Sequence, residues 1–275
     1  MVIIGLPLNH RPRKRIGQNV LRDASIVERI VAAIAPRPGE RLVEIGPGEG
    51  ALTGPLLAAA GRLEAIEIDR DLVARLQQRF DADSGLALHA GDALTFDFRA
   101  LAAGTRLRLV GNLPYNISTP LLFHLFDQLD VVADMHFMLQ KEVVDRLAAT
   151  PGGKTYGRLS LMAQFHCRIT PLLQVPPRAF RPPPKVDSTV VRLVPHPLPP
   201  VALHDPARFR LLVTAAFAQR RKTLRNSLRH HLDAAAMAAA GIDPGRRPET
   251  LTLAEFAGLA NLPAETACVD SGKGL

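Results

Sequence analysis

The strongest constraint on the fold is a regular alternation of short apolar runs with amphipathic helical segments in the first half of the chain. The first helix is predicted in "SIVERIVAAIA", where apolar residues recur at helical spacing from Ser25 onward. Four runs typical of buried strands follow, and each leads into a loop or a helix: "RLVEIG", "LEAIEID", "LALHAGDAL" and "RLRLVGNLPY". Strands that alternate with helices predict an α/β fold with a parallel sheet covered on both faces. Its ligand site is expected at the carboxyl ends of the strands.

The second half of the chain predicts a domain boundary. "ADMHFMLQ" and "TVVRLVPH" are typical of strands and "KEVVDRLAAT" of a helix, whereas "RLSLMAQFHC" fits either a helix or a strand. The segment 195–206 is rich in proline, which suits a linker, and the sequence after it contains no strand candidate. We therefore predict an α/β domain over residues 1–198 and a small all-α domain over residues 199–275.

The balance of charged residues favours a polyanionic partner. The chain has 34 Lys and Arg against 26 Asp and Glu, which gives a formal net charge of +8. The basic residues are concentrated in segments 10–22 and 206–232, neither of which contains an acid. These segments are either solvated basic faces or nucleic-acid contacts, and their clustering favours nucleic acid.

Membrane, disulfide and metal chemistry are all disfavoured. No apolar run is long enough to span a membrane, and "MVIIGLPLNHRPRKR" has too short an apolar part for a signal peptide. Cys167 and Cys268 lack the spacing of a zinc site or a disulfide framework, so no metal is predicted. We expect a cytoplasmic protein that does not associate with membranes.

The glycine-rich turn "EIGPGEGALT" predicts a ligand that contains a nucleoside. Gly46, Gly48 and Gly50 lie between a strand and a helix, where the backbone can approach a ligand closely. Glu67, at the end of the next strand, can bind a ribose diol. This spacing fits both a dinucleotide such as NAD and S-adenosylmethionine. The alternative is that the glycines only turn the chain.

Two further acids favour S-adenosylmethionine over a dinucleotide. Glu44 precedes the glycine turn, and Asp92 lies in a "GDA" loop after the third strand, where it can accept a hydrogen bond from an adenine amino group. The alternative for Asp92 is a cap at the start of a helix.

The stretch Asn112-Leu113-Pro114-Tyr115 predicts methyl transfer to an exocyclic amino group. Pro114 biases Leu113 towards an extended conformation, so the Leu113 carbonyl and the Asn112 side-chain oxygen can hold both hydrogens of such a group. Held in this way, the nitrogen lone pair points at a methyl sulfonium, and the developing positive charge is stabilised. Tyr115 would stack on the base. A turn with a capping amide is the alternative.

A second aromatic residue, Phe180, precedes three prolines in "RAFRPPPKVDSTVVRL". The prolines stiffen the loop, so the Phe180 ring can be held against the other face of a base that has left its stack. Arg181 and Lys185 can contact phosphates nearby. An ordinary rigid connector with Phe180 in the core is the alternative.

Together these motifs make the chain resemble the ribosomal RNA adenine N6-dimethyltransferase family. The matching motifs occur in order: "IGQNVL", "EIGPGEGALT", "IEID", "GDA", "NLPY", "LQKEVVDRL", "YGRLS" and "FRPPPKVDS". "PPPKVDS", "NLPY" and "FAQRRKTLRNSL" are similar to the branch that dimethylates two adjacent adenosines near the 3′ end of 16S rRNA. The resemblance implies a Rossmann-like S-adenosylmethionine-dependent methyltransferase domain followed by a small helical domain, with 16S rRNA in the 30S subunit as the partner of a monomeric enzyme.

The resemblance also implies functions for individual residues. Cofactor binding is expected at Asn19, Leu21, Gly46, Glu67, Asp92 and Asn112. Catalysis is expected at Asn112 and Leu113, with Tyr115 and Phe180 as a stacking pair. RNA binding is expected at Arg181, Lys185, Arg221, Lys222, Arg225 and Arg229. In the helical domain, Arg221, Arg225 and Arg229 are predicted to share one helical face while Leu224 and Leu228 pack inward. The chain departs from the family at Val20, where an aromatic residue is frequent, which affects the expected packing of that loop.

Three other functions stay open. One is a non-catalytic RNA-binding assembly factor that retains the fold, which the presence of Asn112, Tyr115 and Glu67 disfavours. Another is a 23S rRNA adenine N6-methyltransferase, and the last is an NAD-dependent oxidoreductase.

Overall fold

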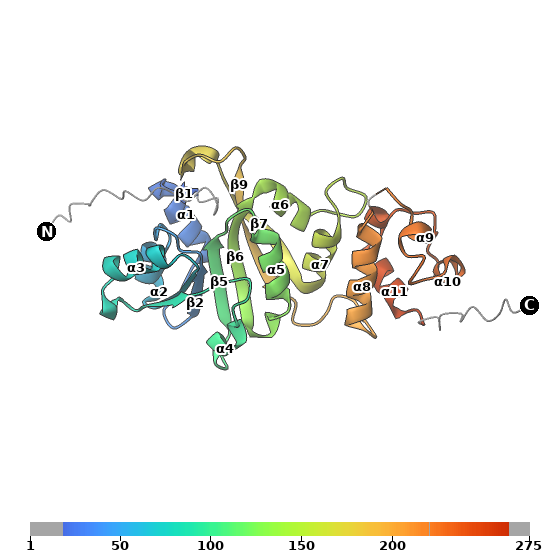
Figure 1. Cartoon of the computed structure of the whole chain (residues 1–275), viewed down its shortest axis with the longest axis horizontal. Coiled ribbons are helices and arrows are strands. Elements are labelled where there is room, and N and C mark those ends of the chain that lie inside the picture. Colours follow the sequence, from blue (N-terminus) through green and yellow to red (C-terminus); the bar gives the residue numbers. More distant parts are fainter. Residues whose placement is uncertain (1–18, 220, 264–275) are drawn as a thin grey trace, which may run out of the picture. The chain divides into compact units, whose positions relative to one another are not determined.

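The computed structural model describes residues 19–219 and 221–263 (Figure 1). The chain divides into two compact units. The first unit runs to Val144 and resumes with Thr170–Val194, and the second comprises Asp145–Ile169 and the chain from Pro195 onward. The helical unit thus includes a segment from within the α/β half, in addition to the C-terminal part. The boundary predicted after residue 198 lies close to the last crossing between the units and stays a prediction.

The first unit is built on a seven-stranded sheet with the order β4-β3-β2-β5-β6-β9-β7 (Figure 1). The pairs β2–β3, β2–β5, β3–β4 and β5–β6 are parallel, and β6–β9 is antiparallel. A separate antiparallel pair joins β1 to β8. The strands are β1 (Val20–Leu21), β2 (Arg41–Ile45), β3 (Leu63–Glu67), β4 (Leu86–Ala90), β5 (Leu107–Asn112), β6 (Val132–Gln140), β7 (Cys167–Val175), β8 (Phe180–Arg181) and β9 (Ser188–Pro195). The predicted α/β fold is confirmed.

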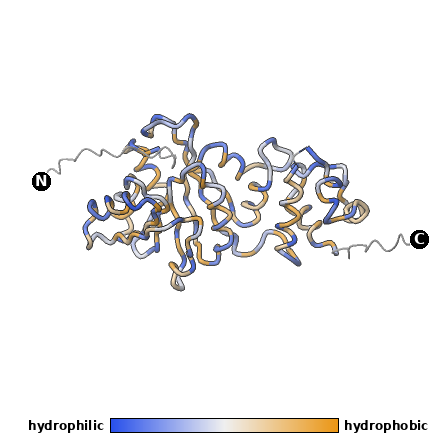
Figure 2. The backbone as a smooth tube through the Cα atoms, viewed as in Figure 1, coloured by the Kyte–Doolittle hydropathy of each residue, from blue (hydrophilic) through white to orange (hydrophobic). Residues whose placement is uncertain are grey.

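Helices alternate with these strands and also make up the second unit. They are α1 (Ala24–Ile34), α2 (Thr53–Ala60), α3 (Arg70–Arg79), α4 (Phe98–Ala102), α5 (Ser118–Phe126), α6 (Lys141–Leu147), α7 (Arg158–His166), α8 (Pro206–Phe217), α9 (Leu224–Ser227), α10 (Ala234–Ala239) and α11 (Leu253–Asn261). The segment left open between helix and strand is α7, and β7 begins directly after it. Figure 2 shows apolar residues along the strands and hydrophilic residues at many turns. In the described part of the chain, no helix has the length and apolarity needed to cross a bilayer.

Helix α1 begins where the sequence provides a cap. Asp23 Oδ1 accepts hydrogen bonds from the backbone nitrogens of Ser25 (3.0 Å) and Ile26 (3.3 Å), two donors that have no partner within the helix. The apolar stripe of α1 enters the core through Ile26, Val27, Ile30 and Ile34. The helix predicted from periodicity is therefore confirmed.

The end of β5 approaches β2 at a distance that only glycine tolerates. A Cβ atom on Gly111 would lie 2.5 Å from the Ile45 carbonyl oxygen of the neighbouring parallel strand. Asn112 follows directly as the last residue of β5. The glycine in "VGNLPY" therefore lets β5 pair closely with β2 and carries Asn112 to the carboxyl edge of the sheet.

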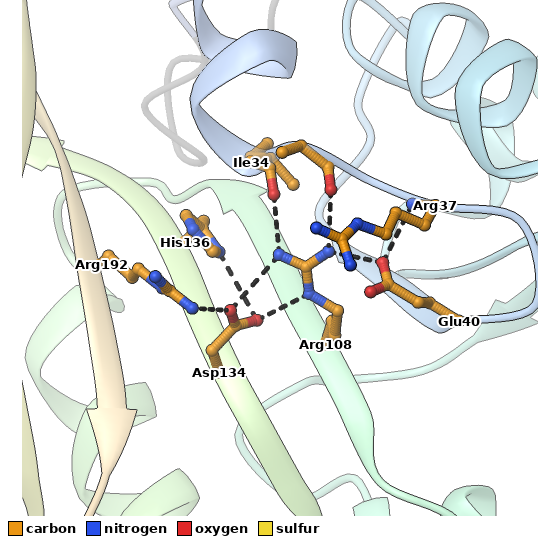
Figure 3. Close-up of polar contacts among 8 residues, drawn as sticks. Ile34, Arg37, Glu40, Arg108, Asp134, His136 and Arg192 are labelled. Atoms are coloured by element: carbon orange, nitrogen blue, oxygen red, sulfur yellow. Dashed lines mark hydrogen bonds and ion pairs between the residues drawn. The ribbon is translucent and has the colours of Figure 1, made fainter.

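An ion-pair network around the buried Asp134 links β5 and β6 to the end of α1 (Figure 3). The Arg108 guanidinium donates to Asp134 (2.9 Å), to Glu40 (2.5 Å) and to the Ile34 carbonyl oxygen (2.7 Å). Asp134 is 4% exposed and also accepts from Arg192 of β9 (2.9 Å). Arg108 thus satisfies a buried carboxylate and a helix carbonyl group at once.

His136 lies inside this network (Figure 3). Its Nδ1 atom is 3.6 Å from Asp134 Oδ1, and its side chain is 1% exposed. Burial lowers the pKa of His136 to about 4, although the nearby Asp134 carboxylate acts in the opposite direction. His136 is therefore uncharged in the folded protein at neutral pH, and Arg108 and Arg192 supply the positive charge that faces Asp134.

In the second unit, the long helix predicted after the proline-rich linker is broken. Helix α8 ends at Phe217, and α9 comprises only Leu224–Ser227. The start of α9 is fixed from elsewhere in the chain, because the Leu224 backbone nitrogen donates to the Arg246 carbonyl oxygen (2.8 Å). That tertiary hydrogen bond replaces the helical one that a continuous helix would provide.

The prediction that Arg221, Arg225 and Arg229 share one helical face is therefore wrong. Arg221 and Lys222 precede α9, Arg225 lies within it and Arg229 follows it, and all four are exposed. The inward packing of Leu224 and Leu228 is confirmed, since both are 0% exposed.

Candidate active site

A cavity of about 560 Å³ lies at the carboxyl ends of the parallel strands. Its walls come from the segments 44–52, 66–71, 91–94 and 112–117, which follow β2, β3, β4 and β5, and from residues 19–21. Segments distant in the sequence meet here because parallel strands end at one edge of the sheet. The cavity thus lies at the edge where the strand pattern predicts a ligand site.

The structure brings the six predicted cofactor residues together. Asn19, Leu21, Gly46, Glu67, Asp92 and Asn112 all line the cavity. Within the described residues, no group of three or more His, Cys, Asp or Glu side chains is arranged to hold a metal ion.

Two backbone amide groups of the glycine turn donate hydrogen bonds to residues of β3. The Gly46 nitrogen donates to the Ile66 carbonyl oxygen (2.9 Å), and the Gly48 nitrogen donates to Glu67 Oε2 (3.1 Å). Gly46 and Gly48 have φ values of +68° and +59°, the left-handed region that favours glycine. A dinucleotide turn binds pyrophosphate through such amides. Here these two donors already have partners within the protein.

Both carboxylates predicted to contact the nucleoside are oriented by backbone amides. Glu67, 5% exposed, accepts from Gly48 through Oε2 and from the Asp69 nitrogen through Oε1 (3.0 Å). Burial raises the pKa of Glu67, and these two hydrogen bonds oppose the shift. Asp92 Oδ1 accepts from the Leu94 nitrogen (2.9 Å), the local contact expected of a capping aspartate, while the residue also lines the cavity.

The cavity is acidic. Six carboxyl groups line it, from Glu44, Glu49, Glu67, Asp69, Asp71 and Asp92, against the guanidinium of Arg70 in the lining and that of Arg22, which pairs with Glu49. A cavity lined in this way attracts cations and repels phosphate groups. The charge therefore favours a cationic ligand over a dinucleotide.

Glu44 is the most deeply buried of these acids at 2% exposure. The Thr53 hydroxyl donates to its Oε2 atom at 2.6 Å. Burial raises the pKa of Glu44 to about 7, against the Thr53 hydrogen bond and together with repulsion from Glu67. Glu44 therefore titrates in the neutral range.

Asn112 and Leu113 place two acceptors at the end of β5. The Asn112 side chain is half-buried, and its Nδ2 donates to the Asn19 carbonyl oxygen (3.4 Å), which turns Oδ1 away from that contact. Leu113 is 1% exposed, and its nitrogen donates to the Met138 carbonyl oxygen (3.2 Å). The Pro114 carbonyl oxygen already accepts from two donors in the following turn. Of these two neighbouring carbonyl groups, Leu113 is thus better placed to bind a ligand.

The two predicted stacking rings lie outside the cavity lining. Tyr115 is half-buried, and its hydroxyl is 3.2 Å from the Ser188 hydroxyl at the end of the proline loop. Phe180 is 3% exposed, pairs with Leu21 across β1 and β8, and belongs to the apolar core around α1. Arg181 and Lys185 in the same loop are exposed.

Sequence analysis missed two features of the site. Asn116 lines the cavity and is exposed, and a second amide so soon after Asn112 was a signal that could have found it. Arg22 forms an ion pair with Glu49 of the glycine turn, and no local pattern indicated that contact.

Comparison with known proteins gives a family match over most of the chain. The model of the family described as "Ribosomal RNA adenine dimethylase" matches residues 9–265. The "Ribosomal RNA small subunit methyltransferase A" of Chromohalobacter salexigens is 58% identical over 266 residues, 95% of this chain and 94% of that protein. The protein of the same name from Methylococcus capsulatus is 60% identical over 253 residues, which cover 92% of this chain and 98% of that protein.

Solved structures resemble the fold of most of the chain. A dimethyladenosine transferase from Plasmodium falciparum has a TM-score of 0.70 and 25% identity, covering 87% of this chain and 95% of that chain. The 23S rRNA methyltransferase ErmE has a TM-score of 0.67 and 24% identity, covering 88% of this chain and 98% of that chain. At this identity the second likeness concerns the fold alone.

Proposed function

The chain belongs to the ribosomal RNA adenine dimethylase family, and from this premise we propose that its targets are two adjacent adenosines near the 3′ end of 16S rRNA. It is an S-adenosylmethionine-dependent enzyme that dimethylates rRNA adenine at N6. The observation that carries the proposal is the 58–60% identity to small-subunit methyltransferases over nearly the whole chain, and the acidic cavity beside Asn112 supports the choice of methyl donor. We further propose that the enzyme acts as a cytoplasmic monomer on the 30S subunit.

The cavity suits S-adenosylmethionine better than a dinucleotide. When bound, this donor supplies an electrophilic methyl group on a positively charged sulfur, which six surrounding carboxyl groups favour. The two anionic phosphates of NAD would meet the same acids and would find the Gly46 and Gly48 amides already bonded. In the proposed arrangement, Glu67 binds the ribose hydroxyls, Asp92 the adenine amino group and Gly46 the methionine part, while Asn19 and Leu21 cover the donor.

The pKa of Glu44 predicts that donor affinity depends on pH. Ionised Glu44 attracts a cationic donor and neutral Glu44 does not, so affinity should rise with pH and level off above about 7. One pH unit below its pKa, a group is about one-tenth ionised, so the loss from pH 8 to pH 6 reaches up to about tenfold. Calorimetric titration of wild type and Glu44→Gln from pH 6 to pH 8 checks this. The variant should show a much flatter profile, and two parallel profiles would contradict the role of Glu44.

Methyl transfer itself needs the target nitrogen to be oriented. The Asn112 Oδ1 atom and the Leu113 carbonyl oxygen would each accept one N6 hydrogen, which directs the nitrogen lone pair into the donor cavity. As the N–C bond forms and the methyl–sulfur bond of the donor breaks, the sulfur would leave as a neutral thioether, and the fixed acceptors would stabilise the positive charge that develops on nitrogen. The product ammonium is acidic and can lose its proton to water, so no strong general base is required.

The second methylation of the same nitrogen has a different hydrogen-bond requirement. The monomethylated N6 has one hydrogen, so only one of the two acceptors stays engaged. The other acceptor must face the new methyl group or find another donor. Asn116, exposed in the same cavity wall, is a nearby amide that can supply such a donor.

Each target base has to leave its stack to reach Asn112. Tyr115 is half-buried three residues after Asn112, and we assign it as one ring that stacks on the base. Phe180 is 3% exposed, so stacking by this ring requires the segment 180–188 to rearrange when RNA binds. The exposed Arg181 and Lys185 would contact phosphates from this segment.

RNA binding is expected to depend strongly on salt. We assign phosphate contacts in the second unit to Arg221, Lys222, Arg225 and Arg229, which are exposed. Each phosphate contact contributes about 0.7–0.9 to the slope of log affinity against log salt concentration. Replacing Arg225 by Ala should therefore reduce the steepness of this slope by the contribution of roughly one phosphate contact. Filter binding to 16S rRNA at several salt concentrations measures the slope, and an unchanged slope would count against this assignment. Arg75→Ala, which removes an exposed charge from α3, is the control.

Transfer of radiolabelled methyl groups tests the function directly. Wild-type protein should label N6 of the two adjacent adenosines in small subunits that lack the modification. Binding to rRNA without transfer would instead indicate the non-catalytic assembly factor, and labelling of large subunits alone would indicate a 23S rRNA enzyme. Assays on free 16S rRNA and on 30S particles, run side by side, identify the form of the substrate.

A further inference from the structure

An ion pair joins two walls of the donor cavity that are distant in the sequence. Arg22 Nη2 lies 2.7 Å from Glu49 Oε2, across 27 positions of the chain. The Glu49 side chain lines the cavity and is 9% exposed, whereas that of Arg22 is 46% exposed. The pair therefore connects the segment that carries β1 to the glycine turn from the outer side of the cavity.

Among the described residues, the segment with β1 is attached through a short ribbon and a few hydrogen bonds. Strands β1 and β8 are two residues each, and a two-stranded ribbon of this length is marginal in water by itself. Beyond the ribbon, the Arg22 backbone nitrogen donates to the Ala179 carbonyl oxygen (2.8 Å), and Leu21 is buried in the core. Within the described part of the chain, the Arg22 side chain thus adds an anchor for this wall of the cavity.

Glu49 offers Arg22 a fixed point of attachment. Its carbonyl oxygen accepts from Arg79 Nη1 of α3 (2.7 Å), while its carboxylate binds Arg22. The next residue packs tightly on the same helix, because a Cβ atom on Gly50 would lie 3.0 Å from Leu76. The glycine turn is therefore held against α3, and Arg22 holds the N-terminal segment to the turn.

The same segment supplies the only protein contact found for the Asn112 amide group among the described residues. Asn112 Nδ2 donates to the Asn19 carbonyl oxygen at 3.4 Å, a long hydrogen bond that a small shift of β1 would break. Asn19 lies next to Val20, where β1 begins. The Asn19 carbonyl group, next to β1, thus favours the orientation in which the Asn112 Nδ2 faces β1.

We propose that Arg22 is a positioning residue: its ion pair with Glu49 holds β1 across the donor cavity and thereby keeps Asn112 Oδ1 directed at the target amino group. The proposal rests on the proposed function, because it assigns a methyl donor to the cavity and an acceptor role to Asn112. It connects donor binding with target orientation, since the cavity wall that covers the donor would also orient the Asn112 acceptor. Arg22 touches neither donor nor target in this arrangement and acts through Glu49 and Asn19.

The test compares Arg22→Ala, Arg22→Lys, Glu49→Gln and the exposed-charge control Arg75→Ala in the full chain. Calorimetry measures S-adenosylmethionine affinity without RNA, and single-turnover methyl transfer to 30S particles at saturating donor measures the chemical step. Arg22→Ala and Glu49→Gln should each weaken donor binding about three- to tenfold, the range for a pair with one buried partner. They should also slow transfer at saturating donor. Arg22→Lys should recover part of both, and Arg75→Ala should match wild type.

A double variant tests whether the effects of Arg22 and Glu49 arise from the ion pair between them. Arg22→Ala/Glu49→Gln should be no worse than either single variant, because each change already breaks the contact. Raising the salt concentration should weaken wild-type donor binding towards that of Arg22→Ala.

Two results would overturn the positioning role. One is donor affinity and turnover of Arg22→Ala and Glu49→Gln equal to those of Arg75→Ala. The other is a lowered melting temperature with donor affinity and the rate of methyl transfer both unchanged, which would mean that the ion pair only stabilises the fold. Failure of the wild-type protein to bind S-adenosylmethionine would instead overturn the proposed function, so the two failures are distinguishable.

Discussion

Asn112→Ala is expected to lose most of its methyl transfer while it still binds the donor. The variant removes one of the two proposed acceptors for the target amino group, and the loss of one preorganised electrostatic group typically lowers turnover by about 10²–10³. Donor affinity should change by less than about tenfold. The hydrogen bond proposed from the target to Asn112 stabilises the transition state, and this contribution is separate from the contacts that bind the donor. Single-turnover transfer at saturating S-adenosylmethionine, together with calorimetry, measures the two quantities.

The control for Asn112→Ala is Gln77→Ala, which removes an exposed amide from α3 in the same unit. It should transfer methyl groups at the wild-type rate. If Asn112→Ala were as active as this control, the acceptor role of Asn112 would be ruled out. A large loss of donor affinity at unchanged saturated turnover would instead place Asn112 in donor binding alone.

Arg108→Ala should be the most destabilising single substitution in the network of Figure 3. The change leaves the Asp134 carboxylate, 4% exposed, with one fewer cation and removes donors from Glu40 and from the end of α1. Burial would raise the pKa of Asp134, but the Arg108 hydrogen bond and nearby positive charge hold it below its usual value. Breaking such a pair costs about 3–5 kcal/mol in the free energy of unfolding. That corresponds to a drop of roughly 6–20 °C in melting temperature.

Urea unfolding followed by circular dichroism measures this loss. The matched control is Arg99→Ala, whose partner Asp130 is 57% exposed, so that little stability should be lost. Arg108→Lys keeps the charge but cannot reach several acceptors with one ammonium group, and it should fall between wild type and Arg108→Ala. It also provides a measurement if Arg108→Ala does not fold. A loss for Arg108→Ala no greater than that for Arg99→Ala would contradict the stabilising role of the network.

Local sequence patterns predicted the elements of the fold because those patterns report which face of each segment is buried. The periodicity of "SIVERIVAAIA" identified α1, and its start is fixed by the neighbouring Asp23. The four apolar runs of the first half became β2, β3, β4 and β5. The helix predicted beyond Phe217 failed at α9, because the Arg246 carbonyl oxygen that binds the Leu224 amide comes from a later loop.

The cavity could likewise be predicted from the sequence. Each residue predicted to bind the methyl donor lies at the end of a strand or just after it, or, like Asn19 and Leu21, belongs to a family motif. Parallel strands end at one edge, so residues at their carboxyl ends meet without further information. The choice between a dinucleotide and S-adenosylmethionine was harder. It depended on the partners of the Gly46 and Gly48 amides and on the charge of the assembled lining, neither of which is a local property.

The sequence by itself determined the α/β architecture and the edge of the sheet at which the cavity lies, because these follow from short-range periodicity and strand direction. Tertiary structure alone decided that Phe180 is buried against Leu21, that Arg108 binds Asp134 and that Arg22 holds Glu49. The physical reason is that each of these contacts joins residues far apart in the chain. Only the packed sheet and helices fix the distance between such residues.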